Sequence, residues 1–131
     1  MANGQKILIV DDECETSGPV AKYLERAGYE TQCAPNGRDA LAMLISGSWD
    51  ALVLDMRMPD MNGVELLQVL RSYLRWTDLP VIFLTGNADS AQEEMAIYLG
   101  ARRIFRKGAF KLEDLLGELQ EALRGPARAE K

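Results

Sequence analysis

Residues 6–13 read Lys-Ile-Leu-Ile-Val-Asp-Asp-Glu, a short apolar run that ends in consecutive acidic residues. The run is continuously apolar rather than alternating, which is typical of a strand buried on both faces of a parallel sheet. Two later runs repeat this pattern, since Ala51–Leu54 ends at Asp55 and Pro80–Leu84 ends at Thr85. We therefore expect these three runs to form the centre of a parallel sheet.

Two less apolar runs, Tyr29–Cys33 and Arg103–Arg106, are expected to form the edge strands of the same sheet. Helical patterns separate the five runs. The clearest is the last, an apolar stripe made of Leu112, Leu115, Leu116, Leu119 and Leu123. Strands that alternate with helices predict an α/β fold with right-handed crossovers and helices on both faces of the sheet.

The helix boundaries follow from capping residues. Asn36 and Asn62 are expected to cap the second and third helices. The first helix is expected to lie between Pro19 and Gly28, and the fourth is expected to start at Asp89 or Ser90 and to stop at Gly100. The second helix is expected to bury Leu41, Leu44 and Ile45, and the third is expected to turn Leu66, Leu70 and Tyr73 inward. The apolar positions that mark the first and fourth helices are Val20, Tyr23, Leu24 and Ala27; and Ala91, Met95 and Tyr98.

The composition indicates one globular domain. The chain has 131 residues, of which 47% are hydrophobic and 27% charged. We expect a leader at residues 1–4, a domain at residues 5–124 and a tail or linker start at residues 125–131. The net charge of −5 argues against direct nucleic-acid binding through bulk charge. The chain has neither a signal-peptide pattern nor a long apolar stretch, so we expect a cytoplasmic protein without a membrane partner.

The sequence contains two cysteines and no histidine. The missing histidine excludes histidine acid–base catalysis and histidine metal sites on this chain. Two cysteines do not make a disulfide framework. Cys14 and Cys33 are therefore interpreted as inert thiols.

Polar residues collect where the predicted strands end. Because ligands of parallel α/β sheets bind beyond the carboxyl ends of the strands, Asp11, Asp12, Asp55, Thr85 and Lys107 should converge there. Two carboxylates 4 Å apart repel by about 4 kcal/mol at an effective dielectric near 20. One surface ion pair returns only about 0–1 kcal/mol, so Lys107 alone does not offset this repulsion. An oxygen-rich pocket of this kind suits Mg²⁺.

Four motifs in order carry a family resemblance: the acidic pair Asp11-Asp12, Asp55-Met-Arg-Met-Pro-Asp-Met-Asn-Gly63, Pro80-Val-Ile-Phe-Leu-Thr-Gly86 and Leu99-Gly-Ala-Arg-Arg-Ile-Phe-Arg-Lys107. The chain resembles the receiver domain of bacterial two-component response regulators over about residues 5–124. This resemblance implies a flavodoxin-like, doubly wound (βα)5 fold with a five-stranded parallel sheet in the order 2-1-3-4-5.

The resemblance also implies a role for each residue of the pocket. Asp55 would be the phosphoacceptor, taking the phosphoryl group from a phosphohistidine of a partner histidine kinase or phosphotransfer protein. Mg²⁺ would be held by Asp12, Asp55 and the backbone carbonyl of Arg57, with Asp11 acting through water. Lys107 and the amides of Met56 and Gly86 would bind the phosphoryl oxygens. Such a domain catalyses its own phosphorylation without being a conventional enzyme.

By the same resemblance, Thr85 and Phe105 would form the switch. One hydrogen bond to a charged group contributes about 1.5–3 kcal/mol, whereas a complete population shift takes about 5.5 kcal/mol. Thr85 alone therefore does not complete the switch. The altered surface would comprise the fourth helix, the fifth strand and the fifth helix. It would bind a downstream protein target, a missing output domain or a second copy of the chain.

One departure and three alternatives accompany this interpretation. Many family members have a cis proline after the lysine, whereas Gly108 follows Lys107 here. A haloacid-dehalogenase-type phosphatase would need an aspartate where Arg57 stands. In a flavodoxin-like flavin carrier, the acidic run at residues 11–13 would repel the phosphate. The third alternative is a pseudo-receiver, a protein-interaction module that is never phosphorylated.

Overall fold

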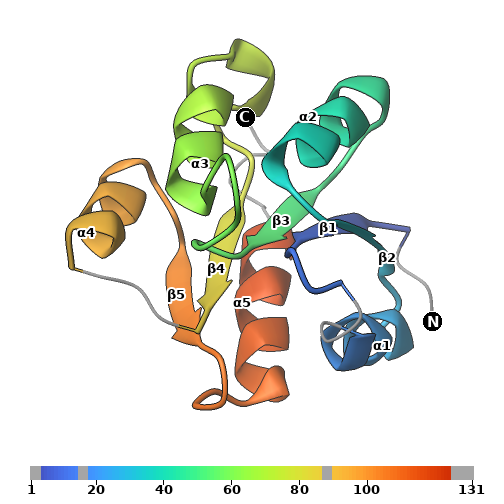
Figure 1. Cartoon of the computed structure of the whole chain (residues 1–131). Coiled ribbons are helices and arrows are strands. Elements are labelled where there is room, and N and C mark those ends of the chain that lie inside the picture. The colour runs from blue at the N-terminus through green and yellow to red at the C-terminus, as the bar shows by residue number, and fades with distance from the viewer. Residues whose placement is uncertain (1–3, 15–17, 87–89, 125–131) are drawn as a thin grey trace.

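The computed structural model describes residues 4–14, 18–86 and 90–124. Its centre is a five-stranded parallel sheet in the order β2-β1-β3-β4-β5, which confirms the predicted fold class and strand order (Figure 1). The strands are β1 (Lys6–Val10), β2 (Glu30–Ala34), β3 (Ala51–Leu54), β4 (Val81–Thr85) and β5 (Arg103–Arg106). β2 and β4 each begin and end one residue later than predicted.

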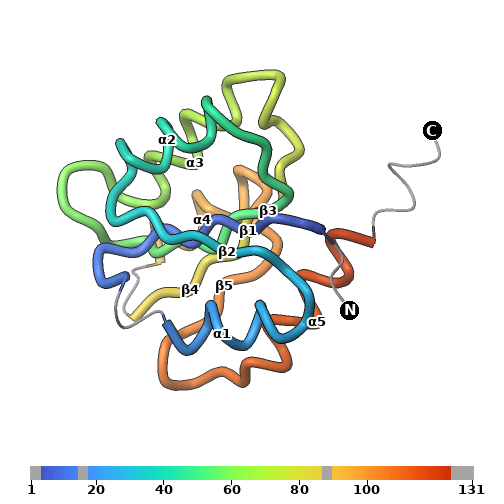
Figure 2. The backbone as a smooth tube through the Cα atoms, turned by 90° about the vertical axis from the view of Figure 1, so that its right-hand side faces the viewer, coloured from blue at the N-terminus to red at the C-terminus, as the bar shows by residue number. Residues whose placement is uncertain are grey.

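Five α-helices and one short 3-10 helix connect and cover the strands. They are α1 (Gly18–Arg26), α2 (Gly37–Ser46), α3 (Gly63–Arg71), η1 (Leu74–Trp76), α4 (Ser90–Tyr98) and α5 (Leu112–Arg124). α1 and α5 lie on one face of the sheet, and α2, α3 and α4 lie on the other (Figure 2). Asp89, residues 1–3 and residues 125–131 lie outside the described residues. None of the helices in the described part of the chain is long and apolar enough to cross a membrane.

The central strands are buried on both faces, as their continuous apolar runs predict. In β1, Ile7 and Ile9 pack in the core under α1 and α5, whereas Leu8 and Val10 pack in the core under α2 and α3. Because successive side chains of a strand point to opposite faces, one apolar run serves both cores. This double burial fixes the register of β1, and so fixes where its acidic end emerges.

Both predicted asparagine caps are present. Asn36 Oδ1 accepts a hydrogen bond from the Asp39 amide at 2.7 Å. Asn62 forms a capping box with Glu65, in which each side chain accepts a hydrogen bond from the other residue's backbone amide. The capping box starts α3 directly beside the end of β3. The carboxyl end of the sheet is therefore braced by a helix N-terminus.

Several predicted core positions are wrong. Ile45 is 63% exposed, because α2 turns Gly37, Ala40 and Leu44 toward the sheet instead. Tyr73 is 51% exposed, because α3 ends at Arg71 and no longer directs the following residues inward. The sequence marked α4 by Ala91, Met95 and Tyr98 without assigning it a buried face. All three are exposed, and the buried residue of this helix is Ala96.

Candidate functional site

Three carboxylates meet at the carboxyl end of the sheet. Asp11, Asp12 and Asp55 each offer an oxygen atom, and these atoms lie within 4.8 Å of one another. The Asp11 amide donates to the Ala34 carbonyl at 3.0 Å, and the Asp55 amide donates to the Val10 carbonyl at 3.0 Å. These bonds continue the ladders of the sheet past the strand ends. The sheet itself therefore holds Asp11 and Asp55 in place.

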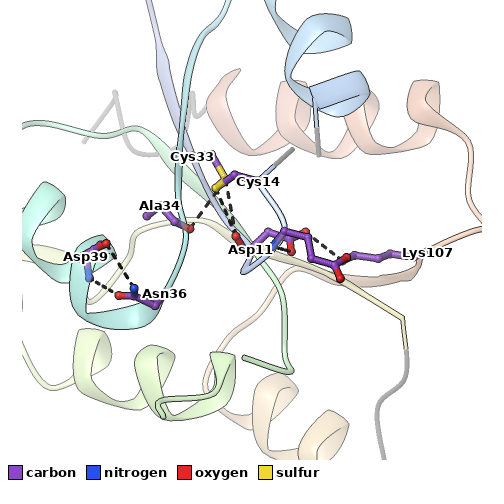
Figure 3. The surroundings of a disulfide bond; sticks show 8 residues. Asp11, Cys14, Cys33, Ala34, Asn36, Asp39 and Lys107 are labelled. Atoms are coloured by element: carbon purple, nitrogen blue, oxygen red, sulfur yellow. Dashed lines mark hydrogen bonds and ion pairs between the residues drawn. A yellow bond between two sulfur atoms is a disulfide. The ribbon is translucent and has the colours of Figure 1, made fainter. Parts of the chain in front are cut away.

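Lys107 lies between two of these carboxylates. Its Nζ atom is 3.0 Å from Asp11 Oδ2 and 3.3 Å from Asp55 Oδ2. Its backbone amide donates to the Thr85 carbonyl at 2.8 Å, one step beyond the paired residues of β4 and β5. Figure 3 shows Lys107 reaching Asp11 from the side opposite the cysteines. One ammonium thus faces three carboxylates, which leaves an excess of negative charge.

The electrostatics of the cluster follow from burial and this excess. Burial of Asp55, and secondarily the neighbouring charge of Asp11, raises its pKa above 3.8, although the Arg57 amide and Lys107 act in the opposite direction. Burial alone would lower the pKa of Lys107. The hydrogen bond to Asp11 and the charge of Asp55 outweigh it, so the Lys107 pKa is raised. The protein therefore favours the charged form of Lys107, whereas ionising Asp55 costs free energy.

The donor atoms of the cluster fit a small divalent cation. Asp11 and Asp55 are buried, whereas Asp12 is exposed beside a cleft of about 520 Å³. The cleft is lined by Asp12, Met56, Arg57, Met58, Pro59, Asn62 and Gln92. Mg²⁺ prefers carboxylate oxygens and keeps several waters, for which an open cleft leaves room. The Asp cluster can hold such a metal.

Thr85 ends β4 with a fully buried side chain. Its Oγ1 is the one buried side-chain nitrogen or oxygen without a hydrogen-bond partner among residues 4–14, 18–86 and 90–124. Such an atom calls for an explanation, because an unsatisfied buried hydroxyl costs about 1–3 kcal/mol.

Phe105 is buried in the core under α1 and α5, and its ring centre lies 5.6 Å from that of Phe110.

The loops after β3 and β4 supply the remaining predicted residues. The Arg57 amide donates to Asp55 Oδ1 at 3.1 Å, which orients the carboxylate. Met56 is buried, and its carbonyl accepts a hydrogen bond from Gly63 at 2.9 Å. Gly86 is exposed, and an added Cβ would meet nothing within 4 Å. The approach to the end of β4 is therefore open.

Gly108 stands where many family members have a cis proline. Its φ is +80°, a conformation that proline cannot adopt because its ring fixes φ near −65°. The described residues contain no cis peptide bond. Ala109 donates to the Arg106 carbonyl at 3.0 Å and closes a tight turn around Lys107. A left-handed glycine thus takes the place of a cis proline in this loop.

The interpretation of the cysteines as inert thiols is wrong. Cys14 and Cys33 form a disulfide, with Cα atoms 5.9 Å apart (Figure 3). Cys33 pairs with Ile9 in the sheet, and Cys14 follows the end of the same strand, so the two meet at one corner. The predicted strand order already placed β2 beside β1. This predicted adjacency could have indicated the disulfide, but the cysteines were interpreted from their number alone.

Comparison with known proteins shows the family of this chain. The family model for the response regulator receiver domain matches residues 7–120. The chain belongs to this family. The receiver domain is 33% identical over 123 residues to the transcriptional regulatory protein GltR of Pseudomonas aeruginosa, covering 94% of the chain and 50% of GltR. The chain thus spans about half the length of the curated relatives it matches.

Solved structures of receiver domains share its fold. The chemotaxis protein CheY4 of Vibrio cholerae is 32% identical, with a TM-score of 0.81 over 92% of this chain and 99% of that one. The response regulator TrrA of Thermotoga maritima, solved in complex with Mg(2+)-BeF, is 28% identical, with a TM-score of 0.79 over 91% and 99%.

Proposed function

We propose that this receiver domain accepts a phosphoryl group on Asp55 in a Mg²⁺-dependent reaction. The observation that carries the proposal is the position of Asp55, buried beside Asp11 and Asp12 with Lys107 Nζ at 3.3 Å. A carboxylate that the sheet holds in place, with a cation beside it, is suited to act as a nucleophile. The Mg(2+)-BeF complex of the similar TrrA supports the choice of metal.

In the proposed transfer, a carboxylate oxygen of Asp55 attacks the phosphorus atom of a partner's phosphohistidine. The new O–P bond forms an acyl phosphate while the N–P bond breaks and the imidazole leaves. The donor histidine must come from elsewhere, because the 131 residues contain none. The proposed partner that supplies this phosphohistidine is a sensor histidine kinase or a phosphotransfer protein.

The residues around Asp55 divide the remaining tasks. Lys107 now bridges Asp11 and Asp55, and it would keep Asp11 while its ammonium turns to the incoming phosphoryl oxygens. The amides of Met56 and Gly86 would donate to the same oxygens. Mg²⁺, when bound, would neutralise charge between the carboxylates and the phosphoryl group. Its proposed ligands are Asp12, Asp55 and the Arg57 carbonyl, with Asp11 through water.

We propose Thr85 as the sensor of phosphorylation. Its hydroxyl lacks a partner in the described part of the chain, and a phosphoryl oxygen would supply one. Phe105 is already buried, so the movement that phosphorylation adds is that of Thr85 and the end of β4. One hydrogen bond is too weak to complete the switch alone. The contact of Lys107 with the phosphoryl group and a change in the packing of Phe105 between the two states would supply the rest.

The proposed output surface is formed by α4, β5 and α5. α4 leaves Met95, Ile97 and Tyr98 exposed, an apolar group suited to a protein partner. Arg106 of β5 forms an ion pair with Glu93 of α4, so a movement of β5 reaches α4. The partner would be a protein target, an output domain joined to residues 5–124, or a second copy of the chain.

The experiment is an intact-mass measurement after incubation with Mg²⁺ and acetyl phosphate. We expect one phosphoryl adduct on the parent protein and none after addition of EDTA. Asp55→Asn should form no adduct. Asp60→Asn is the matched control, because Asp60 is an exposed aspartate of the same loop and asparagine tolerates its φ of +69°.

An Asp55→Asn protein that is phosphorylated as well as the parent would overturn the proposal. An adduct that forms equally well in EDTA would remove the metal from it. If the parent forms no adduct from acetyl phosphate or from a phosphorylated histidine kinase, the chain acts as a pseudo-receiver instead.

A further inference from the structure

The disulfide lies directly beside the acidic cluster. Cys14 is two residues after Asp12 and three after Asp11, so the crosslink ends the acidic loop. The Cys14 Sγ atom lies 3.4 Å from the Asp11 carbonyl oxygen, and the Cys33 Sγ atom lies 3.9 Å from the same oxygen (Figure 3). Both sulfurs therefore pack against the backbone of a residue that forms the site.

The crosslink restrains the part of the loop that the sheet holds least. Asp11 is fixed by its bond to the Ala34 carbonyl at 3.0 Å, and its Oδ1 accepts the Glu13 amide at 2.9 Å. Asp12 is exposed and lies between Asp11 and the crosslink. Breaking the S–S bond would release one end of the segment that carries Asp12.

Both cysteines of the disulfide are partly open to solvent. Cys14 and Cys33 are half-buried, and Cys33, which also packs against the core under α1 and α5, belongs to β2, an edge strand of the sheet. Thiol–disulfide exchange requires an attacking sulfur to reach one of the two sulfurs, so exposed disulfides are the labile ones. A crosslink in the deep core would lack this access.

We propose that Cys14 and Cys33 form a reversible redox site that controls the affinity of the acidic cluster for Mg²⁺. In the oxidising direction, a cysteine sulfur attacks a glutathione disulfide, releasing one glutathione and forming a mixed disulfide. The second cysteine then attacks this bond, closing Cys14–Cys33 and releasing the second glutathione. The two protons of the cysteine thiols end on the two glutathiones, and the pair has lost two electrons.

The oxidised state is the tighter binder, because its loop is already ordered before the cation arrives. The inference rests on the proposed function for the identity of the cation. Ordering about one residue less on binding corresponds to an affinity roughly five- to thirtyfold higher. The same residues bind Mg²⁺ in both states, so reduction weakens binding without abolishing it.

The first measurement counts thiols by alkylation and intact mass in buffers of different glutathione ratio. We expect two alkylated cysteines in excess reduced glutathione and none in excess oxidised glutathione. A disulfide that persists in excess reduced glutathione, or a pair that never closes, would overturn the proposal.

The second measurement is calorimetric titration of Mg²⁺ into the oxidised protein and into the same protein reduced with a phosphine. We expect a dissociation constant roughly five- to thirtyfold higher after reduction. The Cys14→Ser/Cys33→Ser variant is the control and should match the reduced parent in both buffers. Because the parent alone provides both states, the result does not depend on the folding of the variant.

The outcomes separate this inference from the proposed function. Equal Mg²⁺ affinity in the two states overturns the redox site and leaves the phosphoacceptor proposal intact. If Mg²⁺ binds to neither state, both proposals are wrong. A variant whose affinity still changes with the reductant would show that the effect does not come from these cysteines.

Discussion

The burial of Asp55 lowers the stability of the folded protein. Its side chain is nearly inaccessible, and burial is the largest cause of its raised pKa. We therefore expect Asp55→Asn to raise the free energy of unfolding by about 1 kcal/mol in EDTA. Urea denaturation measures this change. Asp60→Asn, at an exposed position, should stay within about 0.5 kcal/mol of the parent. A loss of stability in Asp55→Asn would contradict the account.

The same residue predicts a pH dependence. The folded pKa of Asp55 exceeds the ordinary value of 3.8, so between these two values the folded state binds more protons than the unfolded state. The parent therefore loses stability as pH rises through the folded pKa. The advantage of Asp55→Asn should be full at pH 7 and should shrink as pH falls toward 3.8. An advantage that grows on acidification would reverse the sign.

A third prediction at the scale of single residues concerns Thr85. Thr85→Val keeps the shape and removes a buried hydroxyl without a partner, so we expect about 1 kcal/mol of added stability. The variant should still be phosphorylated. It should not show the change in hydrogen exchange over α4, β5 and α5 that phosphorylation is expected to cause in the parent. Thr77→Val is the matched control. Its hydroxyl donates to the Tyr73 carbonyl at 2.9 Å, so its removal should not stabilise the protein.

At the scale of elements, α3 begins against the end of β3 with almost no clearance. A Cβ on Gly63 would lie 2.2 Å from the Asp55 carbonyl oxygen and 2.9 Å from Phe83 Cε1. We expect Gly63→Ala to cost about 3 kcal/mol, as overpacking does at its upper range, and to displace Asp55. Gly117→Ala in α5 meets nothing within 4 Å and should instead add about 0.5–1 kcal/mol. Thermal unfolding distinguishes the two, and equal effects would contradict the packing described.

The disulfide links β2 to the loop after β1 across a separation of 19 residues. Closing a loop of this size restricts the unfolded chain and contributes about 3 kcal/mol. Reduction should therefore lower the urea midpoint of the parent. The Cys14→Ser/Cys33→Ser variant should show no response to reductant. An unchanged midpoint in the reduced parent would mean that the crosslink does not stabilise the fold.

For the molecule as a whole, local signals in the sequence were enough to predict the five strands and their parallel arrangement, whereas the strand order came from the family resemblance. The runs at β1, β3 and β4 are buried on both faces, so their apolar pattern is strong and their ends place Asp11, Asp55 and Thr85 at one edge. Lys107 was expected at the same edge, but its contacts with both Asp11 and Asp55 could not be derived from the local pattern. The left-handed conformation of Gly108, which follows it, is likewise a property of the folded loop.

The errors have a common physical cause. Ile45 follows helical spacing, but which face of a short helix is buried depends on how the helix docks on the sheet. The disulfide was missed for a related reason. The family resemblance placed β2 beside β1, but no local pattern around Cys14 or Cys33 indicates that their side chains meet.

The central claim is that the acyl phosphate forms on Asp55 and on no other carboxylate. The most direct measurement is reduction of the phosphorylated protein with borohydride, which converts an acyl phosphate to an alcohol, followed by peptide sequencing by mass spectrometry. The account predicts homoserine in place of Asp55, with Asp11, Asp12 and Asp60 unchanged. Reduction at any of these three residues, or no reduced residue in a protein that carries the adduct, would contradict it.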